Sequence, residues 1–287
     1  MAIDYVQTLI GAIGREHMTK EIDIAHLKEL QMQVMDFVDG FCRSNHIKYF
    51  ITAGTLIGAL RHKGYIPWDD DIDIVMLRDD YEKFISMFRD YSRRYKVYSI
   101  ETDDNCHYAY AKVYDDETIF IEGHEREGDK LIGVNVDVFP LDYGTDDYNE
   151  AVRLKKRIKW IDDIVTVKRI APKDRGLIKN FSLHVLKAIC SIIPFSWCIK
   201  RIDRMARRFE ADINSRYVVN AVIYAKGERE RLERKWFNES IEVSFEGRRY
   251  LAPVGADQYM RRLFGDYMKL PPEDKRISHH LFRAYFK

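Results

Sequence analysis

The segment DDDIDIVM, residues 69–76, crowds carboxylates together and then alternates them with isoleucines. Successive side chains of a strand point to opposite faces of a sheet. We therefore expect the isoleucines to lie in the core, with Asp71 and Asp73 sharing the other face. Asp70 has the apolar parity, so we expect it to cap an element or form a turn. Carboxylates this close repel one another, so the fold has to supply something that offsets the repulsion.

A second segment repeats the pattern. In residues 134–139 three valines share one face, and Asp137 has the opposite parity. If the two strands are neighbours, Asp71, Asp73 and Asp137 converge. Converging carboxylates favour a hard divalent cation, Mg²⁺ or else Mn²⁺, which takes oxygen ligands and keeps positions for phosphate oxygens. Asp69 is a further candidate ligand. The alternative is that these acids are surface residues or helix caps.

A glycine-threonine pair lies upstream of the acidic run. The segment IKYFITAG predicts a strand that ends at Gly54, and TLIGALRHKG predicts a short helix that ends at Gly64. The N–H groups at the start of a helix bind phosphate well. Gly54 allows close approach, and Thr55 can add a hydrogen bond. The pair alone is a weak signal, and its position ahead of the carboxylates gives it weight.

The remaining periodicity predicts an α+β fold, a mixed sheet flanked by helices and followed by a mainly helical half. We take 1–145 as the sheet-centred region and 146–287 as a helical, basic region. Its final hairpin, around Glu246-Gly247, is a candidate to pack back on the sheet. The expected helices are 22–45, 78–95, 148–170, 177–193, 197–213 and 255–265. Further strands are expected at 95–101, 107–115, 118–123 and 131–143, the last closed by Pro140.

The formal net charge of +1 hides a strong polarity along the chain. Residues 1–150 hold 16 basic and 30 acidic residues, a net charge of −14, and the rest holds 31 and 16, a net charge of +15. This division favours cation binding in the first half and attraction of anions to the second. The alternative is that the second half is helical, with its basic residues on solvated faces.

Few features indicate secretion or a membrane span. The four cysteines form no CxxC pair, which is typical of reduced thiols in a cytoplasmic protein. The first residues lack the basic region of a signal peptide, and no apolar run reaches the ~20 residues that cross a bilayer. Residues 181–209, apolar first and then basic, suit either a peripheral contact at the inner face of the membrane or a buried helix pair.

Together these motifs resemble the polymerase-β-like nucleotidyltransferase superfamily. The longer string GTLIGALRHKGYIPWDDDIDIVM, with the later VDVFPLD and LPPEDKR, resembles the narrower LicD family. The resemblance covers about 25–145 and resumes near 240–280, with Phe264-Gly265 where the family has Tyr-Gly. It implies a nucleotidyltransferase-like sheet core and transfer of phosphorylcholine, or a related phospho-alcohol, from a CDP-linked donor to a cell-surface glycan.

The resemblance also implies roles for individual residues. Asp71, Asp73 and Asp137 would hold Mg²⁺ against the diphosphate of CDP-choline or another CDP-alcohol, with CMP as the leaving group. The proton acceptor would be Asp137, His279 or His280. Four basic residues are candidates to bind phosphate. Arg61 and Lys63 follow the predicted phosphate-binding helix, Lys112 lies on a predicted strand, and Arg276 ends the LPPEDKR segment. Candidate aromatic contacts to choline or to the base are Tyr65, Trp68 and Tyr110.

Other functions remain open from the sequence. Within enzymes, the alternatives are a nucleotidyltransferase that moves NMP from an NTP to a small molecule or sugar, and a transferase of ribitol or glycerol phosphate, since fukutin-related transferases share the core. A nucleic-acid-binding protein is a different class, but no recognised nucleic-acid module is present, and we expect no nucleic-acid partner. A non-catalytic scaffold is disfavoured by the complete acid set.

Overall fold

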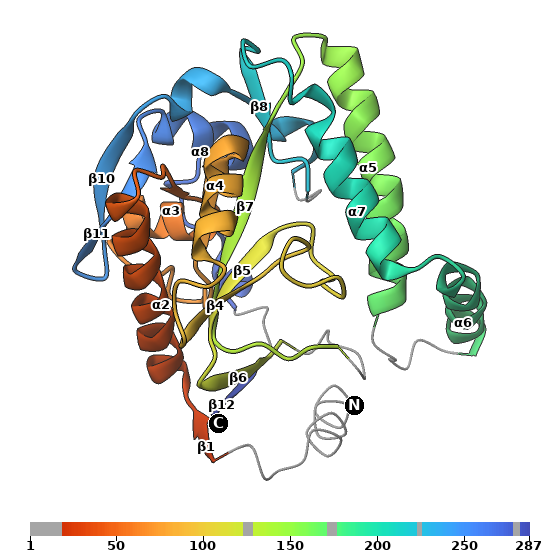
Figure 1. Ribbon diagram of the computed structural model, residues 1–287, viewed down its shortest axis with the longest axis horizontal. Coiled ribbons are helices and arrows are strands. Elements are labelled where there is room, and N and C mark those ends of the chain that lie inside the picture. The colour runs from red at the N-terminus through yellow and green to blue at the C-terminus, as the bar shows by residue number, and fades with distance from the viewer. Residues whose placement is uncertain (1–18, 123–128, 171–176, 223–225, 278–281) are drawn as a thin grey trace.

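The computed structural model describes residues 19–122, 129–170, 177–222, 226–277 and 282–287 (Figure 1). Its centre is a curled mixed sheet in which the neighbouring strands run β2-β3-β7-β5-β4. These are β2 Phe50–Ile51, β3 Asp73–Leu77, β7 Asn135–Tyr143, β5 Ala111–Asp115 and β4 Tyr95–Tyr98. Strands β3 and β7 are parallel, and the other neighbours are antiparallel. The fold is therefore mixed α and β, as expected.

The parity expected for the two acidic strands is confirmed. Ile72 and Ile74 are fully buried, as are Val134, Val136 and Val138. Residues alternating with them face the other side of the sheet, so each strand buries one row of side chains and presents carboxylates on the other. Strand β2 is shorter than expected, because the chain enters a helix at Ala53.

We expected Pro140 to end strand β7, but the strand continues through Pro140 to Tyr143. The reason lies in its neighbours. On one side β7 pairs with β5 as far as Val138, and with β8, Tyr217–Val219, from Asp142 onward. Pro140 falls between these two partners, where its missing N–H costs no hydrogen bond to either strand.

Three helices from the first half surround the sheet. Helices α2, Ile24–Ser44, and α4, Arg78–Phe88, both pack on the sheet, and their aromatic side chains interlock; the rings of Phe41 and Phe88 are 4.9 Å apart. The Asp23 side chain caps α2 by accepting from the His26 N–H at 2.8 Å. Helix α3, Ala53–Arg61, joins β2 to the acidic segment and packs on β3.

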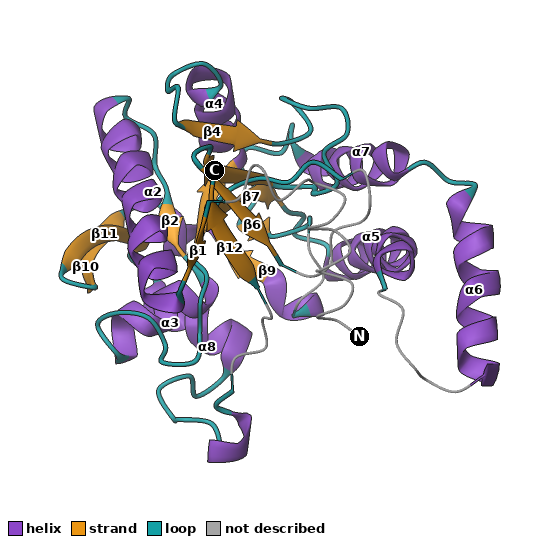
Figure 2. Ribbon diagram, turned by 90° about the horizontal axis from the view of Figure 1, so that it is seen from below, coloured by secondary structure: helices purple, strands orange, loops and turns teal. Residues whose placement is uncertain are grey.

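The second half begins with helices α5, Tyr148–Arg169, α6, Leu177–Ser191, and α7, Phe195–Ala206. Helices α5 and α7 pack on each other, and α6 stands at the far edge of the molecule (Figures 1 and 2). Later strands return to the sheets of the first half. Strands β8 and β9, Arg231–Glu233, extend the central sheet from β7, and β12, Arg283–Phe286, pairs with β1, Lys20–Ile22, and with β6, Thr118–Ile121.

The expected hairpin is present as β10, Ser240–Phe245, and β11, Arg248–Pro253, and it lies against β2. Its two turn residues, Glu246 and Gly247, both have positive φ, 49° and 74°. This is the backbone of the two-residue turns that match the twist of a hairpin. Helix α8, Ala256–Phe264, follows and contacts α3. Short 3₁₀ turns occupy 207–209, 227–230, 234–237 and 273–275.

A buried ion cluster joins α4, β7 and α7. The Arg78 side chain is almost fully buried and donates to Asp142 at 2.7 Å and to Asp203 at 3.2 Å. Burial raises the pKa of Asp203 to about 6, although Arg78 opposes this. One guanidinium thus pairs with carboxylates from two elements that are far apart in sequence, and it fastens the helical half to the sheet; Arg207 also donates to Asp203, at 2.8 Å.

We predict that Arg78→Ala destabilises the protein by about 3–5 kcal/mol, because it leaves the buried Asp142 carboxylate without its cation and leaves Asp203 with Arg207 alone. Equilibrium unfolding in urea measures the change. The control is Arg261→Ala, which removes an exposed pair with Asp257 within one helix and should cost less than about 1 kcal/mol. Equal losses in the two variants would show that the buried cluster does not carry this weight.

Candidate active site

The carboxylates expected to converge lie on adjacent strands. Asp73 on β3 and Asp137 on β7 are direct neighbours in the parallel register, and Lys112 on β5 is the partner of Asp137 on its other side. The order of the strands therefore sets two carboxylates and one ammonium in a row across the sheet. Asp71 lies two residues before Asp73, the first residue of β3, and adds a third carboxylate beside this row.

Lys112 is the buried cation of the row. Its Nζ lies 2.8 Å from Asp137 Oδ1 and 3.4 Å from Glu122 Oε2, and it donates to Asn135 Oδ1 at 3.2 Å. Burial alone would lower the pKa of Lys112, but Asp137 and Glu122 raise it well above its ordinary value. The lysine is therefore charged, and it offsets part of the negative charge around it.

One lysine does not neutralise the cluster. Burial, followed by the charges of Asp71, Asp137 and Asp69, raises the pKa of Asp73 well above its ordinary value. Burial likewise raises the pKa of Asp137 to about 6, although Lys112 opposes this. The carboxylates thus repel one another in the absence of a further cation.

Gly54 and Thr55 hold the acidic segment close to the start of α3. A Cβ at Gly54 would clash with the Asp69 carboxylate, so a glycine is needed for this approach. The Thr55 hydroxyl is buried and accepts a hydrogen bond from the Asp73 N–H at 2.9 Å. Thr55 therefore fastens helix α3 to strand β3, which is a positioning contact that the sequence did not indicate.

The backbone at the start of α3 is unusual. Ala53 has a φ of 45°, in the left-handed region that non-glycine residues seldom adopt. The preceding Thr52 is held from both sides: its N–H donates to the Asp73 carbonyl at 3.0 Å, and its hydroxyl lies 2.6 Å from that of Tyr259. Backbone strain of this kind persists only where the surroundings impose it, and it concentrates at functional sites.

Two cavities meet at Asp71. The first, of about 280 Å³, contains the start of α3 together with Asp69 and Asp73. Its far wall comes from the second half of the chain and comprises Asn220, Lys226, Glu230, Leu232, Tyr259, Leu263 and Phe264. We call it the α3 cavity. Sequence reasoning missed these residues, because no local motif marks them and only the fold brings them to the acidic segment.

The second cavity, of about 240 Å³, contains Asp137 and Lys112. Its lining comes from six separate segments and is mainly polar and aromatic; it includes Glu122, Tyr110, Phe120 and Phe282. We call it the aromatic cavity. The Phe120 and Phe282 rings are 5.6 Å apart, and Tyr110 stacks on Phe139 at 4.4 Å. Asp70 was expected to cap an element or form a turn, but it is buried and also lines this cavity; its carbonyl accepts from Gln31 at 2.8 Å.

The donor set suits a hard divalent cation in chemistry, since it consists of carboxylate oxygens next to a helix start. Asp137 Oδ1 is buried and receives no hydrogen bond of good geometry, although Lys112 lies within ion-pair distance. Within the described residues, no three His, Cys, Asp or Glu side chains are close enough together to coordinate an ion as they stand. Coordination by Asp71, Asp73 and Asp137 would therefore require side-chain rotations.

Three candidate phosphate ligands lie away from both cavities. Arg61 donates to the Tyr267 carbonyl at 2.6 Å, and Arg276 donates to the Pro271 carbonyl at 2.8 Å. Lys63 is exposed, in the turn after α3. The positions of Arg61 and Lys63 follow from geometry, because α3 has nine residues and its end is roughly 12 Å from its start. In the described residues the cations that line the cavities are Lys112 and Lys226.

The candidate aromatic residues likewise divide into one that lines a cavity and two that do not. Tyr110 lines the aromatic cavity. Tyr65 is buried, its hydroxyl donates to Gln31 at 3.0 Å, and its ring packs on Phe245, so it belongs to the core. Trp68 contacts the His62 ring and lines neither cavity. The histidines His279 and His280 lie outside the described residues.

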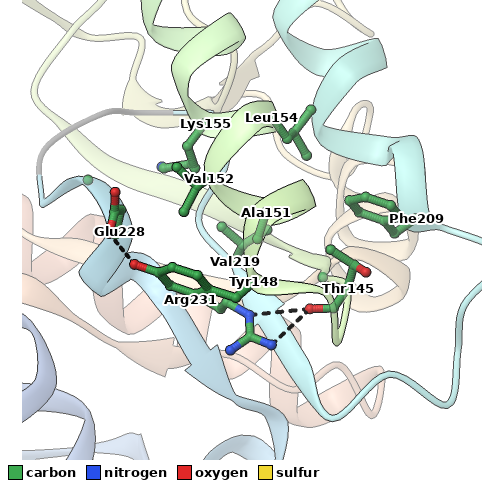
Figure 3. A pocket seen from close by; sticks show the side chains of 12 residues that line it. Thr145, Tyr148, Ala151, Val152, Leu154, Lys155, Phe209, Val219, Glu228 and Arg231 are labelled. Carbon is green, nitrogen blue, oxygen red and sulfur yellow. Dashed lines mark hydrogen bonds between the residues drawn. The ribbon is translucent and has the colours of Figure 1, made fainter.

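A third hollow, at the start of α5, is small and apolar (Figure 3). It holds about 20 Å³, enough for about one water molecule. Arg231 closes one side by donating to the Thr145 carbonyl at 3.1 Å, and Tyr148 bonds to Glu228. This hollow is a junction between α5 and β9 and contains none of the predicted site residues.

The site is thus a cluster of carboxylate side chains beside the start of a helix. Residues 46–166 match the family model described as "LicD/FKTN/FKRP, nucleotidyltransferase domain". The chain therefore contains a LicD-family domain, and the resemblance expected from its motifs is confirmed.

The comparison with known proteins extends beyond this domain. The lipopolysaccharide cholinephosphotransferase LicD of Haemophilus influenzae is 27% identical over 273 residues, covering 93% of this chain and 99% of that protein. An uncharacterized protein of Rickettsia typhi is 33% identical over 144 residues, covering 48% of this chain and 42% of that protein. Another, of Rickettsia prowazekii, is 41% identical over 66 residues, covering 23% of this chain and 25% of that protein.

We predict that Asp73→Asn stabilises the metal-free protein at pH 8 by about 0.5–2 kcal/mol, because it removes one of the repelling charges. The folded pKa of Asp73 is raised, so its destabilising effect is absent below the unfolded pKa and grows as pH rises. The gain should therefore vanish near pH 3. Thermal unfolding in EDTA measures it.

Two comparisons sharpen this test. The exposed substitution Asp90→Asn should leave stability within about 0.5 kcal/mol. Added Mg²⁺ should raise the melting temperature of the unsubstituted protein more than that of Asp73→Asn. A loss of stability in Asp73→Asn at pH 8 would contradict the account of mutual repulsion.

Proposed function

We propose that this protein is a Mg²⁺-dependent phosphotransferase that moves phosphorylcholine from CDP-choline to a hydroxyl of a cell-surface glycan. The observation that carries the proposal is the direct pairing of Asp73 with Asp137 on parallel strands, beside the start of α3. Two further findings support it. The chain contains a LicD-family domain, and its Haemophilus relative is named as a cholinephosphotransferase of lipopolysaccharide.

In this proposal Asp71, Asp73 and Asp137 hold the cation, with Asp69 as a further ligand. Bound Mg²⁺ would neutralise charge on the diphosphate as the reaction proceeds. The N–H groups at the start of α3 bind phosphate oxygens, at the point where Gly54 permits close approach. The acceptor hydroxyl attacks the distal phosphorus, a new P–O bond forms, and the bond to the CMP oxygen breaks.

The acceptor has to lose its proton during this exchange. Asp137 is the candidate base in the described part of the chain, because its pKa of about 6 allows it both to take and to release a proton near neutral pH. Lys112 beside it stays charged and keeps the carboxylate oriented. His279 and His280 are the alternative bases.

The two cavities suit the two ends of the donor. We assign the nucleotide to the α3 cavity, which contains the helix start, Lys226, and the rings of Tyr259 and Phe264. We assign the choline group to the aromatic cavity. Its rings come from Tyr110, Phe120 and Phe282, and its acidic residues outnumber Lys112. A quaternary ammonium binds well against aromatic faces in a negatively charged setting, whereas ribitol or glycerol would gain nothing from that charge.

We predict that Asp71→Asn or Asp73→Asn lowers Mg²⁺-dependent CMP release from CDP-choline by at least about 10³-fold, because each removes a proposed ligand of the ion. CMP is quantified by chromatography after incubation with donor and a glycan acceptor. The control Asp90→Asn, far from the acidic row in sequence and exposed, should retain full activity. Release of pyrophosphate from an NTP, without CMP from any CDP-alcohol, would instead support the nucleotidyltransferase alternative.

We predict that Phe120→Leu and Phe282→Leu each raise KM for CDP-choline about tenfold, since a cation–π contact is worth on the order of 1–2 kcal/mol. KM for CDP-glycerol, whose alcohol group has no positive charge, should change less than twofold. The matched control is Phe264→Leu in the α3 cavity, which should affect both donors alike because both contain the nucleotide. Equal effects of Phe282→Leu on both donors would contradict the placing of choline.

A further inference from the structure

Helix α6 exposes large apolar side chains to an unusual degree. On this helix Phe181 is 71% exposed and Ile189 59%, and Val185 and Leu186 are also exposed; Ile192, directly after the helix, is 81% exposed. The helix stands at the edge of the molecule, away from the central sheet (Figures 1 and 2). Contiguous apolar surface of this kind on a folded protein marks a site of interaction with a protein or a membrane.

Two tryptophans continue this surface onto the neighbouring helices. Trp160 on α5 is 64% exposed and Trp197 on α7 is 48% exposed. Both line a groove of about 500 Å³ between α5 and α7. Helix α7 begins directly after α6, and the C-terminal end of α5 lies at the same end of the pair (Figure 1). Trp197, the third residue of α7, therefore lies close to the end of α6, and Trp160 lines the same groove.

Beyond the tryptophans the surface becomes basic. Arg153, Lys156 and Arg157 are exposed on α5, and Arg201 and Arg204 are exposed on α7. Each of these five lacks an ion-pair partner among the described residues, whereas Lys159 pairs with Asp163 and Lys200 with Asp104. We call the five basic residues, with Trp160 and Trp197, the basic-tryptophan face. Its charge is not neutralised within the described structure.

The other side of α7 is buried against the rest of the protein. Cys198, Ile199, Ile202 and Ala206 are buried on its inner side. In the described residues no single helix passes the length and hydropathy test for crossing a bilayer; Phe181–Ser191 and Phe195–Phe209 pass it only as a pair, bent by 74°. The exposed side of α7, like that of α5, is thus the surface of a packed helix pair, with α6 attached to it.

We propose that α6 and the basic-tryptophan face lie on the surface of an anionic lipid bilayer. The apolar side chains of α6 enter the boundary between headgroups and acyl chains, the tryptophans lie at headgroup level, and the five basic residues bind lipid phosphates. The order apolar, tryptophan, basic is the order that such a boundary requires. A second copy of the chain would bring ten like charges together, which disfavours self-association through this face.

Vesicle binding tests this surface without any assay of turnover. The purified chain should sediment with vesicles of phosphatidylglycerol and phosphatidylcholine in 50 mM salt, and much less with phosphatidylcholine alone or in 500 mM salt. Lys156→Gln/Arg157→Gln/Arg201→Gln should lower the partition coefficient on the order of 100-fold, since each basic residue contributes about fivefold to sevenfold. Trp160→Ser/Trp197→Ser should lower it at least about tenfold.

Matched variants control for unspecific effects. Lys235→Gln/Arg249→Gln removes exposed charges outside the face, and Ile213→Ser removes an exposed apolar side chain elsewhere; both should bind as the unsubstituted chain does. Circular dichroism confirms folding. Absence of binding to anionic vesicles, or equal binding by all variants, would overturn the proposal. So would sedimentation-equilibrium data showing a dimer that Trp160→Ser/Trp197→Ser makes monomeric, because a second copy would then cover the face.

Discussion

Electrostatic repulsion among the carboxylates at the start of β3 and on β7 is the constraint on which the site depends. Asp71, Asp73 and Asp137 are brought together by parallel strand pairing, and burial prevents water from screening them. Lys112 offsets part of this charge and is itself buried to do so. In the proposed function, a bound divalent cation would offset the remaining imbalance.

The surrounding structure holds this unfavourable arrangement in place. Ile72 and Ile74 fix the acidic segment in the core, and the Thr55 hydroxyl ties Asp73 to helix α3. The second half of the chain also supports the site directly, since Tyr259 contacts Thr52 at the strained start of α3. Arg78, at the other end of β3, anchors the helical half through Asp142 and Asp203. Stability elsewhere thus compensates for the strain at the site.

Strand parity could be predicted from the sequence because it depends only on neighbouring residues. The buried isoleucines and valines, and the Glu246-Gly247 turn, all follow from local rules. From the sequence, the adjacency of the two acidic segments was only a condition, and the pairing of Asp73 with Asp137 in the parallel register meets it. Continuation of β7 through Pro140 was not predictable, since it depends on β5 ending and β8 beginning there.

The residues that line the two cavities were harder still to predict from the sequence. Phe120, Phe282, Lys226 and Tyr259 come from separate segments that meet only in the fold, and no motif links them to the acidic run. Conversely, Arg61 is close to that run in sequence but sits at the far end of α3. Proximity in sequence was a poor guide wherever a helix intervened. The alternation in TIFI was the one signal that set Phe120 apart from Ile119 and Ile121.

The central claim is that the acidic row holds a divalent cation that bridges to the diphosphate of the donor. Anomalous diffraction from crystals grown with Mn²⁺ and CDP-choline tests it most directly. The account predicts a manganese peak bound by oxygens of Asp71, Asp73 and Asp137, with the diphosphate between it and the start of α3. A well-ordered nucleotide whose diphosphate lies away from these carboxylates, with no manganese beside them, would contradict it.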